Sequence, residues 1–446
     1  MESSVSEQLR HGRMSLFQIR AVAICLTIHM LDGFDILVIA FLAPEIARQW
    51  SLSPEELGVL FSAGLAGMTF GSLFLSPLAD VYGRRPVILL SLVVTSTGMI
   101  LSAFTEDLTG LVAVRVLTGL GIGTVLASLA TIVAEYASDR RRAAAVSVSM
   151  AGLPIGGILG GVITVYLLEH FDWQTVFIFG GLMTGLMIPL ALAFLPESVD
   201  YMLTRPAPDT LGRINKLMLK MGKSTVTEVP MVDSKSVSVV TRVAGLFQPT
   251  LRRQTMLIWC CFFLTMSSLY FAQTWTPKIM VDAGFEVSEG VSIGILIQLG
   301  ALVGIAMIGV LTVRLSIYAT AAALMVVGFL SMVVFSFNLV NIDIVYVLAI
   351  CIGLGINAAV VALYAIVPDI YPAEVRTTAL GWAIGIGRSS AVLAPAIAGY
   401  LLGVGTELTV VYFGFAAPML LAAIAVLATK PDKKKEERRK INGPFI

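Results

Sequence analysis

Residues 21–43 read AVAICLTIHMLDGFDILVIAFLA, an apolar run long enough to cross a bilayer as one helix. Asp32 and Asp35 lie near the middle of this run, three positions apart, so both project from nearly the same helix face. A carboxylate at that depth costs about 2.5–3.5 kcal/mol on insertion scales, and acids inside membrane spans are functional candidates by default. The pair therefore predicts a site that handles protons or ions inside a membrane transporter.

The composition is that of a polytopic membrane protein. Hydrophobic residues make up 57% of the chain and charged residues only 13%, whereas a soluble protein carries about 25% charged residues. A net charge of +1 with no basic, aromatic-rich patch gives no reason to expect a nucleic-acid partner. We expect no disulfide framework, because all the cysteines fall within apolar runs, where free thiols pack as small apolar groups: Cys25, Cys260, Cys261 and Cys351.

The residue inventory also argues against an enzyme. Three histidines leave little for metal chemistry, and the sequence has no His, Cys and Asp cluster at ligand spacing. It has no nucleophile elbow and no phosphate loop either. We therefore expect no catalytic residues, no metal and no cofactor.

Twelve apolar runs recur along the chain in two groups of six, and we predict that each is a transmembrane helix. The runs cover 21–43, 56–78, 87–104, 109–137, 143–168, 174–195, 255–277, 288–313, 317–337, 342–367, 377–403 and 408–429. The predicted domains are a cytoplasmic tail (1–20), two six-helix halves (21–195 and 255–429), a cytoplasmic linker (196–254) and a basic cytoplasmic tail (430–446). Within the linker, residues 209–221 are predicted to form an amphipathic helix on the membrane surface.

The distribution of basic residues supports this count and sets the orientation. With the N-terminus inside, the inner loops and tails hold 26 of the 30 Lys and Arg residues, and the outer loops hold only Arg48 and Lys278. A wrong number of spans would scramble this positive-inside alternation. The sequence therefore predicts an all-α membrane protein with twelve transmembrane helices and both termini in the cytoplasm.

The loop after the second run reads SPLADVYGRRP, residues 76–86. It resembles the signature loop of the major facilitator superfamily, Gly-x-Leu-x-Asp-basic-x-Gly-basic-basic, and departs from it at Ser76 and Val81. The resemblance implies the major facilitator fold and a gating role for this loop, although a simple positive-inside anchor is the alternative. The equivalent second-half loop, GVLTVRLSIY at 309–318, has Val313 at the acid position. The gating residues expected from the two loops and the fourth run are Asp80, Gly83, Arg84, Arg85, Glu135 and Arg314.

The fourth run contains RVLTGLGIG at 115–123, with Arg115, Gly119 and Gly123 on one helix face. It is similar to an Arg-x-x-x-Gly-x-x-x-Gly pattern of the superfamily, which implies a role for Arg115 in proton coupling. Because a guanidinium cannot deprotonate, it needs an acid or carbonyl groups inside the membrane. A buried pairing that only fixes the packing is the alternative, and His29, one turn before Asp32, is likewise expected to be a hydrogen-bonded structural residue rather than a relay.

Several segments resemble one family within the superfamily, the aromatic acid:proton symporters. DGFD at 32–35 is similar to their Asp-Gly-x-Asp signature, and further matches are EYASDRRR (135–142), LPES (195–198), WTPK (275–278) and YPAEVRTTALGWAIGIGR (371–388). They cover both halves of the chain, although LPES is also shared with sugar carriers. The resemblance implies a symporter that imports a benzoate-type or hydroxybenzoate-type acid and resides in a bacterial inner membrane.

Arg388 lies about 17 Å into the eleventh run by helical rise, near the bilayer midplane. A fixed cation at that depth suits a carboxylate substrate, because arginine offers a two-pronged hydrogen-bonding fork. Transporter sites commonly lie at this level between the two halves. The side chains predicted to surround the substrate with Arg388 are Phe34, Tyr270, Gln273, Tyr364 and Trp382, with Trp275 a further aromatic candidate.

We therefore predict a proton-coupled importer of a monocyclic aromatic carboxylate that works by alternating access. Asp32 and Asp35 would form the proton-coupling pair, Arg388 would bind the substrate carboxylate, and the expected partners are substrate, protons and membrane lipid, with a monomeric chain. One alternative is a carrier of a non-aromatic organic anion, such as muconate or a lactone acid. A proton-driven exporter is another, since GLPIGGILGG at 152–161 is similar to the glycine-rich fifth helix of exporters.

Overall fold

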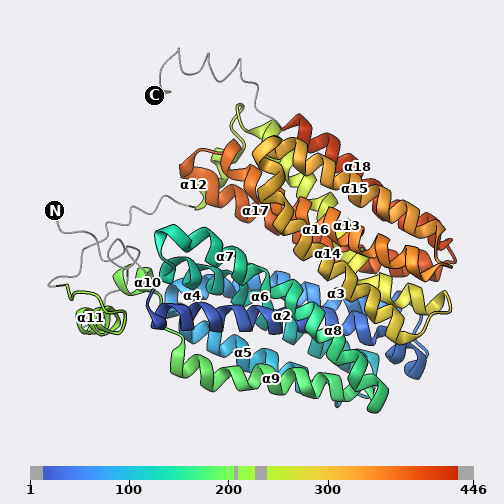
Figure 1. Cartoon of the computed structure of the whole chain (residues 1–446), viewed down its shortest axis with the longest axis horizontal. Coiled ribbons are helices and arrows are strands. Elements are labelled where there is room, and N and C mark those ends of the chain that lie inside the picture. The colour runs from blue at the N-terminus through green and yellow to red at the C-terminus, as the bar shows by residue number, and fades with distance from the viewer. Residues whose placement is uncertain (1–13, 205–208, 227–238, 430–446) are drawn as a thin grey trace. The chain divides into compact units, whose positions relative to one another are not determined.

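The computed structural model describes residues 14–204, 209–226 and 239–429, and almost all of them are helical (Figure 1). The predicted basic tail and most of the predicted N-terminal tail lie outside the described residues. Among the described residues, twelve helices are long and apolar enough to cross a membrane, which confirms the predicted all-α fold with its twelve spans.

Some helices run longer than the apolar runs that predicted them, such as α2 and α13, whereas others match the runs closely. In the first half they are α2 Leu16–Trp50, α3 Pro54–Phe70, α4 Ala79–Tyr82, α5 Arg84–Ser102, α6 Leu108–Tyr136, α7 Arg142–Met150, α8 Gly152–His170 and α9 Trp173–Phe194. Shorter helices follow, namely α10 Val199–Thr204, α11 Thr210–Lys220 and α12 Val239–Leu246. The second half contains α13 Arg252–Asp282, α14 Val287–Arg314, α15 Ile317–Phe337, α16 Ile342–Ile370, α17 Ala373–Gly403 and α18 Leu408–Ala428.

Polar residues next to the apolar runs fix where several helices begin. Ser15 starts α2 with a capping box, in which its hydroxyl accepts from the Gln18 N–H and the Gln18 side chain accepts from the Ser15 N–H. Ser53 and Glu56 repeat this arrangement at the start of α3. The caps pair N–H groups that would otherwise lack a partner at a helix start, so these short polar segments fix where α2 and α3 begin.

The described chain divides into two compact units. One comprises the residues up to Ser236 together with Thr274–Ile295, and the other comprises Val237–Gln273 together with the chain from Leu296 onward. Helices α13 and α14 therefore each contribute residues to both units. In the first unit, Phe61 of α3 packs edge-to-face on Trp275 of α13, with ring centroids 5.3 Å apart.

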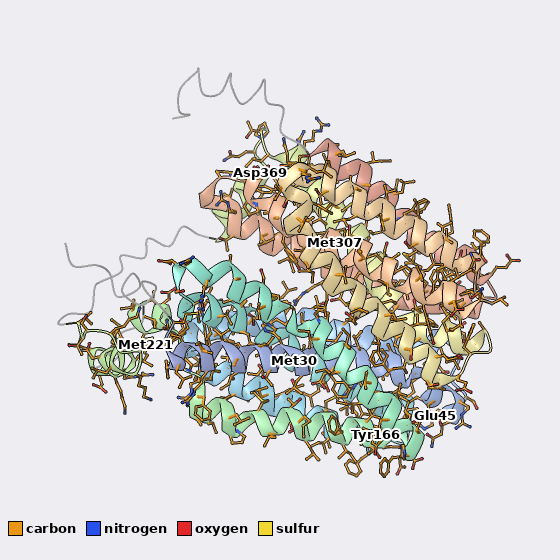
Figure 2. The ribbon with its side chains drawn as sticks, in the orientation of Figure 1. Met30, Glu45, Tyr166, Met221, Met307 and Asp369 are labelled. Atoms are coloured by element: carbon orange, nitrogen blue, oxygen red, sulfur yellow. The ribbon has the colours of Figure 1, made fainter. Side chains whose placement is uncertain are left out.

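The glycines of GLPIGGILGG allow α8 to lie directly against α2. A Cβ atom at Gly156 would overlap the Met30 carbonyl of α2, and one at Gly33 would overlap the Leu153 carbonyl of α8. Met30 is labelled beside α8 in Figure 2. Close backbone contact of this kind holds helices together where lipid removes the hydrophobic driving force. The crossing fixes the depth at which Asp32 lies.

The predicted linker helix is present as α11, but its apolar side does not lie open for a membrane surface. Ile214, Met218 and Met221 are buried in the same apolar cluster as Cys25 of α2 and Met202 of α10. The expectation of a membrane-surface helix is therefore wrong for this face, because other parts of the first unit already cover it. Met221, which directly follows α11, is labelled in Figure 2.

We predict that Gly156→Ala destabilises the protein because the added methyl group would force α2 and α8 apart. Overpacking of a close contact costs about 1–3 kcal/mol. The measurement is the thermal midpoint of the detergent-purified protein. Gly414→Ala in α18 is the matched control, because a Cβ there has no neighbour within 4 Å. Equal midpoints for the two variants would contradict the role of the crossing.

Candidate functional site

The two acids of DGFD are buried in the interior of the first unit. Asp32 and Asp35 lie about 24 and 28 Å along α2 by helical rise, and each is 3% exposed. Among the described residues, Asp32 Oδ2 and both carboxylate oxygens of Asp35 have no partner in hydrogen-bonding geometry. A buried acid without donors is strongly disfavoured as an anion, so the pair needs either a nearby cation or a proton.

Arg115 supplies the cation from α6. Its guanidinium is 3% exposed and donates to Ser102 Oγ at 2.6 Å and to Thr118 Oγ1 at 3.1 Å. It also lies over the ring of Phe177 on α9, 4.8 Å from the centroid, and approaches the Met99 sulfur at 3.3 Å. Neutral groups therefore hold the guanidinium in place, which leaves its charge free to act on an acid.

Asp35 is the acid on which Arg115 acts. The two groups interact electrostatically without direct contact, and Thr184 of α9 also lies beside the Asp35 carboxyl. Asp32 interacts with Asp35 in turn. With both acids ionised, the three groups carry one net negative charge, and a single bound proton makes them neutral. The arrangement can therefore exchange one proton between a charged and a neutral state.

His29, one turn before Asp32, is also buried. Its Nδ1 lies 2.9 Å from Ser149 Oγ on α7, and its Nε2 has no hydrogen-bond partner. A Cβ at Gly152 would contact the His29 Cβ, so the ring is confined by α8 as well. The structure thus places His29 in a fixed, hydrogen-bonded position, as the sequence suggested.

Arg388 of α17 occupies the second unit with two of the tyrosines named from the sequence. Its guanidinium lies within electrostatic range of the phenol groups of Tyr270 on α13 and Tyr364 on α16. Phe262 of α13 packs edge-to-face on Tyr364, with ring centroids 5.6 Å apart. Three helices therefore bring a cation, two hydroxyl groups and an aromatic surface together.

The other predicted substrate residues have the following surroundings. Trp382 precedes Arg388 by six residues, about 120° around α17, and stacks on Trp259 with centroids 5.9 Å apart. Phe34 belongs to the first unit, where it packs against Phe179 at 6.5 Å. Gln273 is the last residue that α13 contributes to the second unit, three positions beyond Tyr270.

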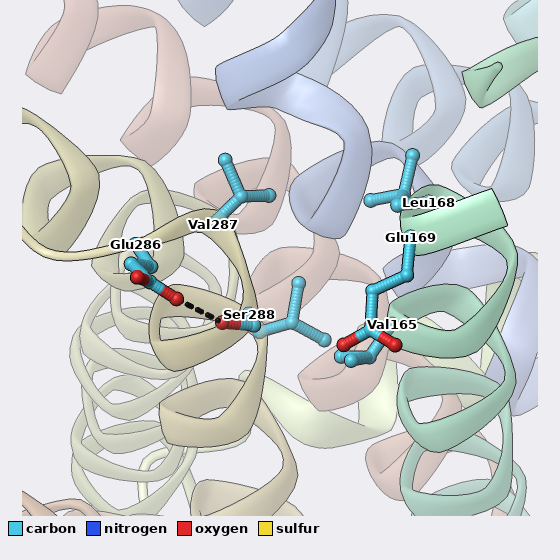
Figure 3. A pocket seen from close by; sticks show the side chains of 7 residues that line it. Val165, Leu168, Glu169, Glu286, Val287 and Ser288 are labelled. Carbon is cyan, nitrogen blue, oxygen red and sulfur yellow. Dashed lines mark hydrogen bonds between the residues drawn. The ribbon is translucent and has the colours of Figure 1, made fainter. Parts of the chain in front are cut away.

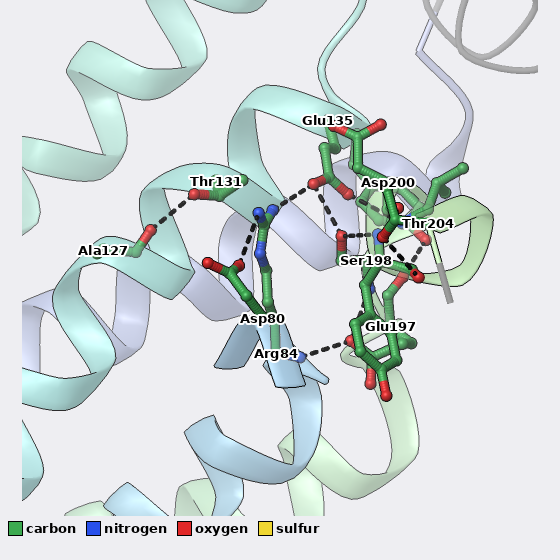
Figure 4. Close-up of polar contacts among 12 residues, drawn as sticks. Asp80, Arg84, Ala127, Thr131, Glu135, Glu197, Ser198, Asp200 and Thr204 are labelled. Atoms are coloured by element: carbon green, nitrogen blue, oxygen red, sulfur yellow. Dashed lines mark hydrogen bonds and ion pairs between the residues drawn. The ribbon is translucent and has the colours of Figure 1, made fainter. Parts of the chain in front are cut away.

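The charged loop after the second span joins a network at one end of the first unit (Figure 4). Arg84 forms an ion pair with Glu135 of α6 and approaches Asp80 at 3.7 Å. Glu135 also accepts from the Ser198 hydroxyl at 2.8 Å and from the Val199 N–H at 2.9 Å. Glu135 thereby caps the start of α10 while it binds the arginine.

Glu197, from the LPES segment, accepts hydrogen bonds on the opposite side of this network. Its Oε1 accepts the backbone N–H groups of Arg84 at 2.8 Å, Arg85 at 3.1 Å and Ser198 at 2.8 Å. The first two belong to the first turn of α5, where an anion is favoured. Gly83 precedes that turn with φ 102°, and a Cβ there would contact the Glu197 carboxylate.

The second unit has a different arrangement at the corresponding loop. Arg314, the basic residue of the second-half loop, is exposed at the end of α14 and has no ion pair within the described part of the chain. Instead, the Tyr318 hydroxyl donates to Asp369 Oδ2 at 2.8 Å. Tyr318 follows Arg314 by four positions, just as Arg85 follows Val81 in the first loop. The remaining residue predicted to act in gating is Arg85, whose guanidinium donates a hydrogen bond to the Leu192 carbonyl.

A recess of about 230 Å³ lies between α8 and the start of α14 in the first unit (Figure 3). Val165, Val287 and Val291 form its apolar lining, and Glu169 and Glu286 lie at its edges. Both carboxylates are exposed, so the recess lacks the buried polar groups of a binding site. Among the described residues, no three His, Cys, Asp or Glu side chains come together as metal ligands.

Several site residues were not predicted from the sequence. Ser102, Thr118 and Thr184 contact the charged groups, but a hydroxyl in an apolar run is too common to be informative. Glu197 could have been found, because LPES places an acid at the end of a span near the arginine pair.

We predict that Glu197→Ala loosens the first turn of α5, because the backbone N–H groups of Arg84 and Arg85 lose their acceptor. Hydrogen bonds to a charged group contribute about 1.5–3 kcal/mol. Amide hydrogen exchange in the peptide that contains Arg84 and Arg85 should become faster. Glu197→Gln, which keeps an acceptor oxygen, should change it less. Unchanged exchange in Glu197→Ala would contradict the capping role.

Comparisons with known proteins agree with this architecture. The chain is 29% identical to a gallate transporter from Pseudomonas putida over 95% of this chain and 94% of the relative. It is 27% identical to a benzoate transport protein from Acinetobacter baylyi, over 95% of this chain and 92% of the relative. The xylose transporter XylE of E. coli, solved in a partially occluded inward-open conformation, shares the fold with a TM-score of 0.70 at 14% identity, covering 94% of this chain and 99% of that one.

The family model described as Major Facilitator Superfamily matches residues 25–340 and 313–445, and these ranges together cover nearly the whole chain. Proteins of this family are transporters rather than enzymes. The chain therefore belongs to the major facilitator superfamily and is a membrane transporter.

Proposed function

We propose that this protein imports a monocyclic aromatic carboxylate together with protons, by alternating access in a bacterial inner membrane. Both relatives described above carry the name of an aromatic acid, gallate or benzoate, and match nearly the whole chain. The positive-inside distribution of Lys and Arg supports cytoplasmic termini. On that orientation the Arg84–Glu135 network lies at the cytoplasmic face.

The observation that carries the substrate proposal is the group formed by Arg388, Tyr270 and Tyr364. A carboxylate can accept two parallel hydrogen bonds from a guanidinium, and neighbouring phenol hydroxyls can donate to the same oxygens. Phe262 and Tyr364 add ring surfaces suited to the edge-to-face packing of a benzene ring. Gln273 remains a candidate for a further polar contact.

Asp32, Asp35 and Arg115 would carry the proton. Because the group is neutral with one proton and negative without it, binding and release of that proton change the charge buried in the first unit. A neutral interior is easier to move past apolar helices than a charged one. Coupling this change to substrate binding would make import depend on the proton gradient.

The charged network of Asp80, Arg84 and Glu135 would act as the cytoplasmic latch, with Gly83 and Arg85 shaping its turn. Its ion pair and N-terminal caps connect the loop after the second span to α6 and α10. We propose that these bonds stabilise one conformation of the first unit and are exchanged during transport. Arg314 would contribute charge at the corresponding loop of the second half.

We predict that Asp35→Asn and Asp32→Asn each abolish concentrative uptake of labelled benzoate or 4-hydroxybenzoate in cells, because the amide cannot carry the proton. A protonophore should abolish uptake by the unaltered protein. In proteoliposomes without a pH gradient, the asparagine variants should keep substrate exchange, which needs no net proton movement.

Glu286→Gln is the matched control for that experiment, since Glu286 is an exposed acid outside the charged cluster. It should transport normally. Uptake that survives both asparagine substitutions would remove the coupling role of the acids. No uptake of either acid by the unaltered protein would favour the muconate-type carrier, or an exporter assayed in inverted vesicles.

We predict that Arg388→Ala raises the KM for benzoate by about 10- to 100-fold, because a charge-assisted pair with the carboxylate contributes about 1.5–3 kcal/mol. Arg388→Lys should recover only part of the affinity, since an ammonium lacks the planar fork. The control is Arg48→Ala, whose side chain is exposed and pairs only with Glu45. Equal KM values for Arg388→Ala and Arg48→Ala would place the carboxylate elsewhere.

A further inference from the structure

Asn357 places an unused hydrogen-bond acceptor in the middle of α16. Its Nδ2 donates to the Gly353 carbonyl of the same helix at 3.1 Å. Because a carbonyl can only accept, this bond fixes which end of the amide is nitrogen. In the part of the chain that the structure describes, no donor reaches the Asn357 Oδ1. The side chain is half-buried, so a ligand that covers this oxygen without donating to it would leave the oxygen without a partner.

The Asn357 side chain faces the same way as Tyr364 and away from α15. Helix α15 packs on α16 through Gly355, where a Cβ would overlap the backbone of Gly328. Asn357 follows Gly355 by two positions, about 200° around the helix, and therefore projects from the opposite side. Tyr364 follows Asn357 by seven positions and projects from the same side.

Asn357 also lies at the depth of Arg388. It precedes the end of α16 at Ile370 by thirteen residues, about 20 Å of helical rise. Arg388 follows the start of α17 at Ala373 by fifteen residues, about 22 Å. Helices α16 and α17 follow one another directly in the chain, so the two depths are counted from the same end of the unit. Tyr364, which interacts with Arg388, connects the two positions.

We propose that Asn357 Oδ1 accepts a hydrogen bond from a ring hydroxyl of the substrate whose carboxylate Arg388 holds. The protein is then selective for hydroxylated benzoates over benzoate itself. This assignment rests on the proposed function, since it requires an aromatic carboxylate at Arg388. Only a donor satisfies the free oxygen, and an unsubstituted ring would cover it without a partner. A site that leaves a buried polar group unpaired discriminates against that ligand.

The test is the affinity of the purified full-length protein for three probes: benzoate, 3-hydroxybenzoate and 4-hydroxybenzoate. Titration calorimetry should show at least one hydroxybenzoate binding about five-fold more tightly than benzoate. In Asn357→Leu, which keeps the branched shape of the side chain but has no polar atoms, that preference should disappear while benzoate affinity is maintained. The 2-hydroxy isomer serves as an internal control, because its hydroxyl already bonds to its own carboxylate.

Asn338→Ala is the matched control variant. Asn338 ends α15 and donates to the Val334 carbonyl of its own helix at 2.8 Å, the same bond that Asn357 makes. The Asn338→Ala variant should keep the preference for hydroxybenzoate over benzoate. A preference that persists in Asn357→Leu, or its absence in the unaltered protein, would overturn the role of Asn357 alone. Failure of every aromatic acid to bind the unaltered protein would overturn the proposed function as well.

Discussion

A charge buried among membrane helices must be balanced inside the protein, and much of the first unit follows from this constraint. Asp32 and Asp35 lie on α2, whereas the balancing cation, Arg115, lies on α6. Bringing them together requires α2, α6 and α9 to meet, and the glycines of α8 allow the close crossing that holds α2 in place. The apolar bulk of the chain thus serves to position a few polar atoms.

The two intramembrane arginines meet this constraint differently. Neutral hydroxyls, a thioether and a phenylalanine ring surround Arg115, so its charge is directed toward Asp35. Arg388 is partly exposed and lies beside the phenol groups of Tyr270 and Tyr364. Both phenols are neutral hydrogen-bonding groups, so this setting suits a role in holding a substrate carboxylate. This difference underlies the separate roles proposed for the two units.

Features that depend on local pattern could be predicted from the sequence. The twelve spans followed from apolar length and charge alternation, and the acid pair and both arginines followed from polar residues inside those spans. Features that depend on partners distant in sequence could not be predicted in this way. Glu197 caps α5 across a separation of 113 residues, Thr184 reaches Asp35 from α9, and the apolar face of α11 finds protein instead of lipid. Amphipathicity predicts that one face of a helix will be buried, but it does not predict whether protein or lipid buries that face.

The separation of Asp35 from Arg115 along the chain also affects how the protein is made. Synthesis proceeds from the N-terminus at about 5–20 residues per second, so roughly 4–16 s separate the appearance of the two residues. During that interval the first helix leaves the ribosome with two acids and without the guanidinium that later balances them. Until α6 is made, only bound protons can remove the charge of these acids, so the arrival of Arg115 changes the electrostatic environment of a helix that has already been synthesised.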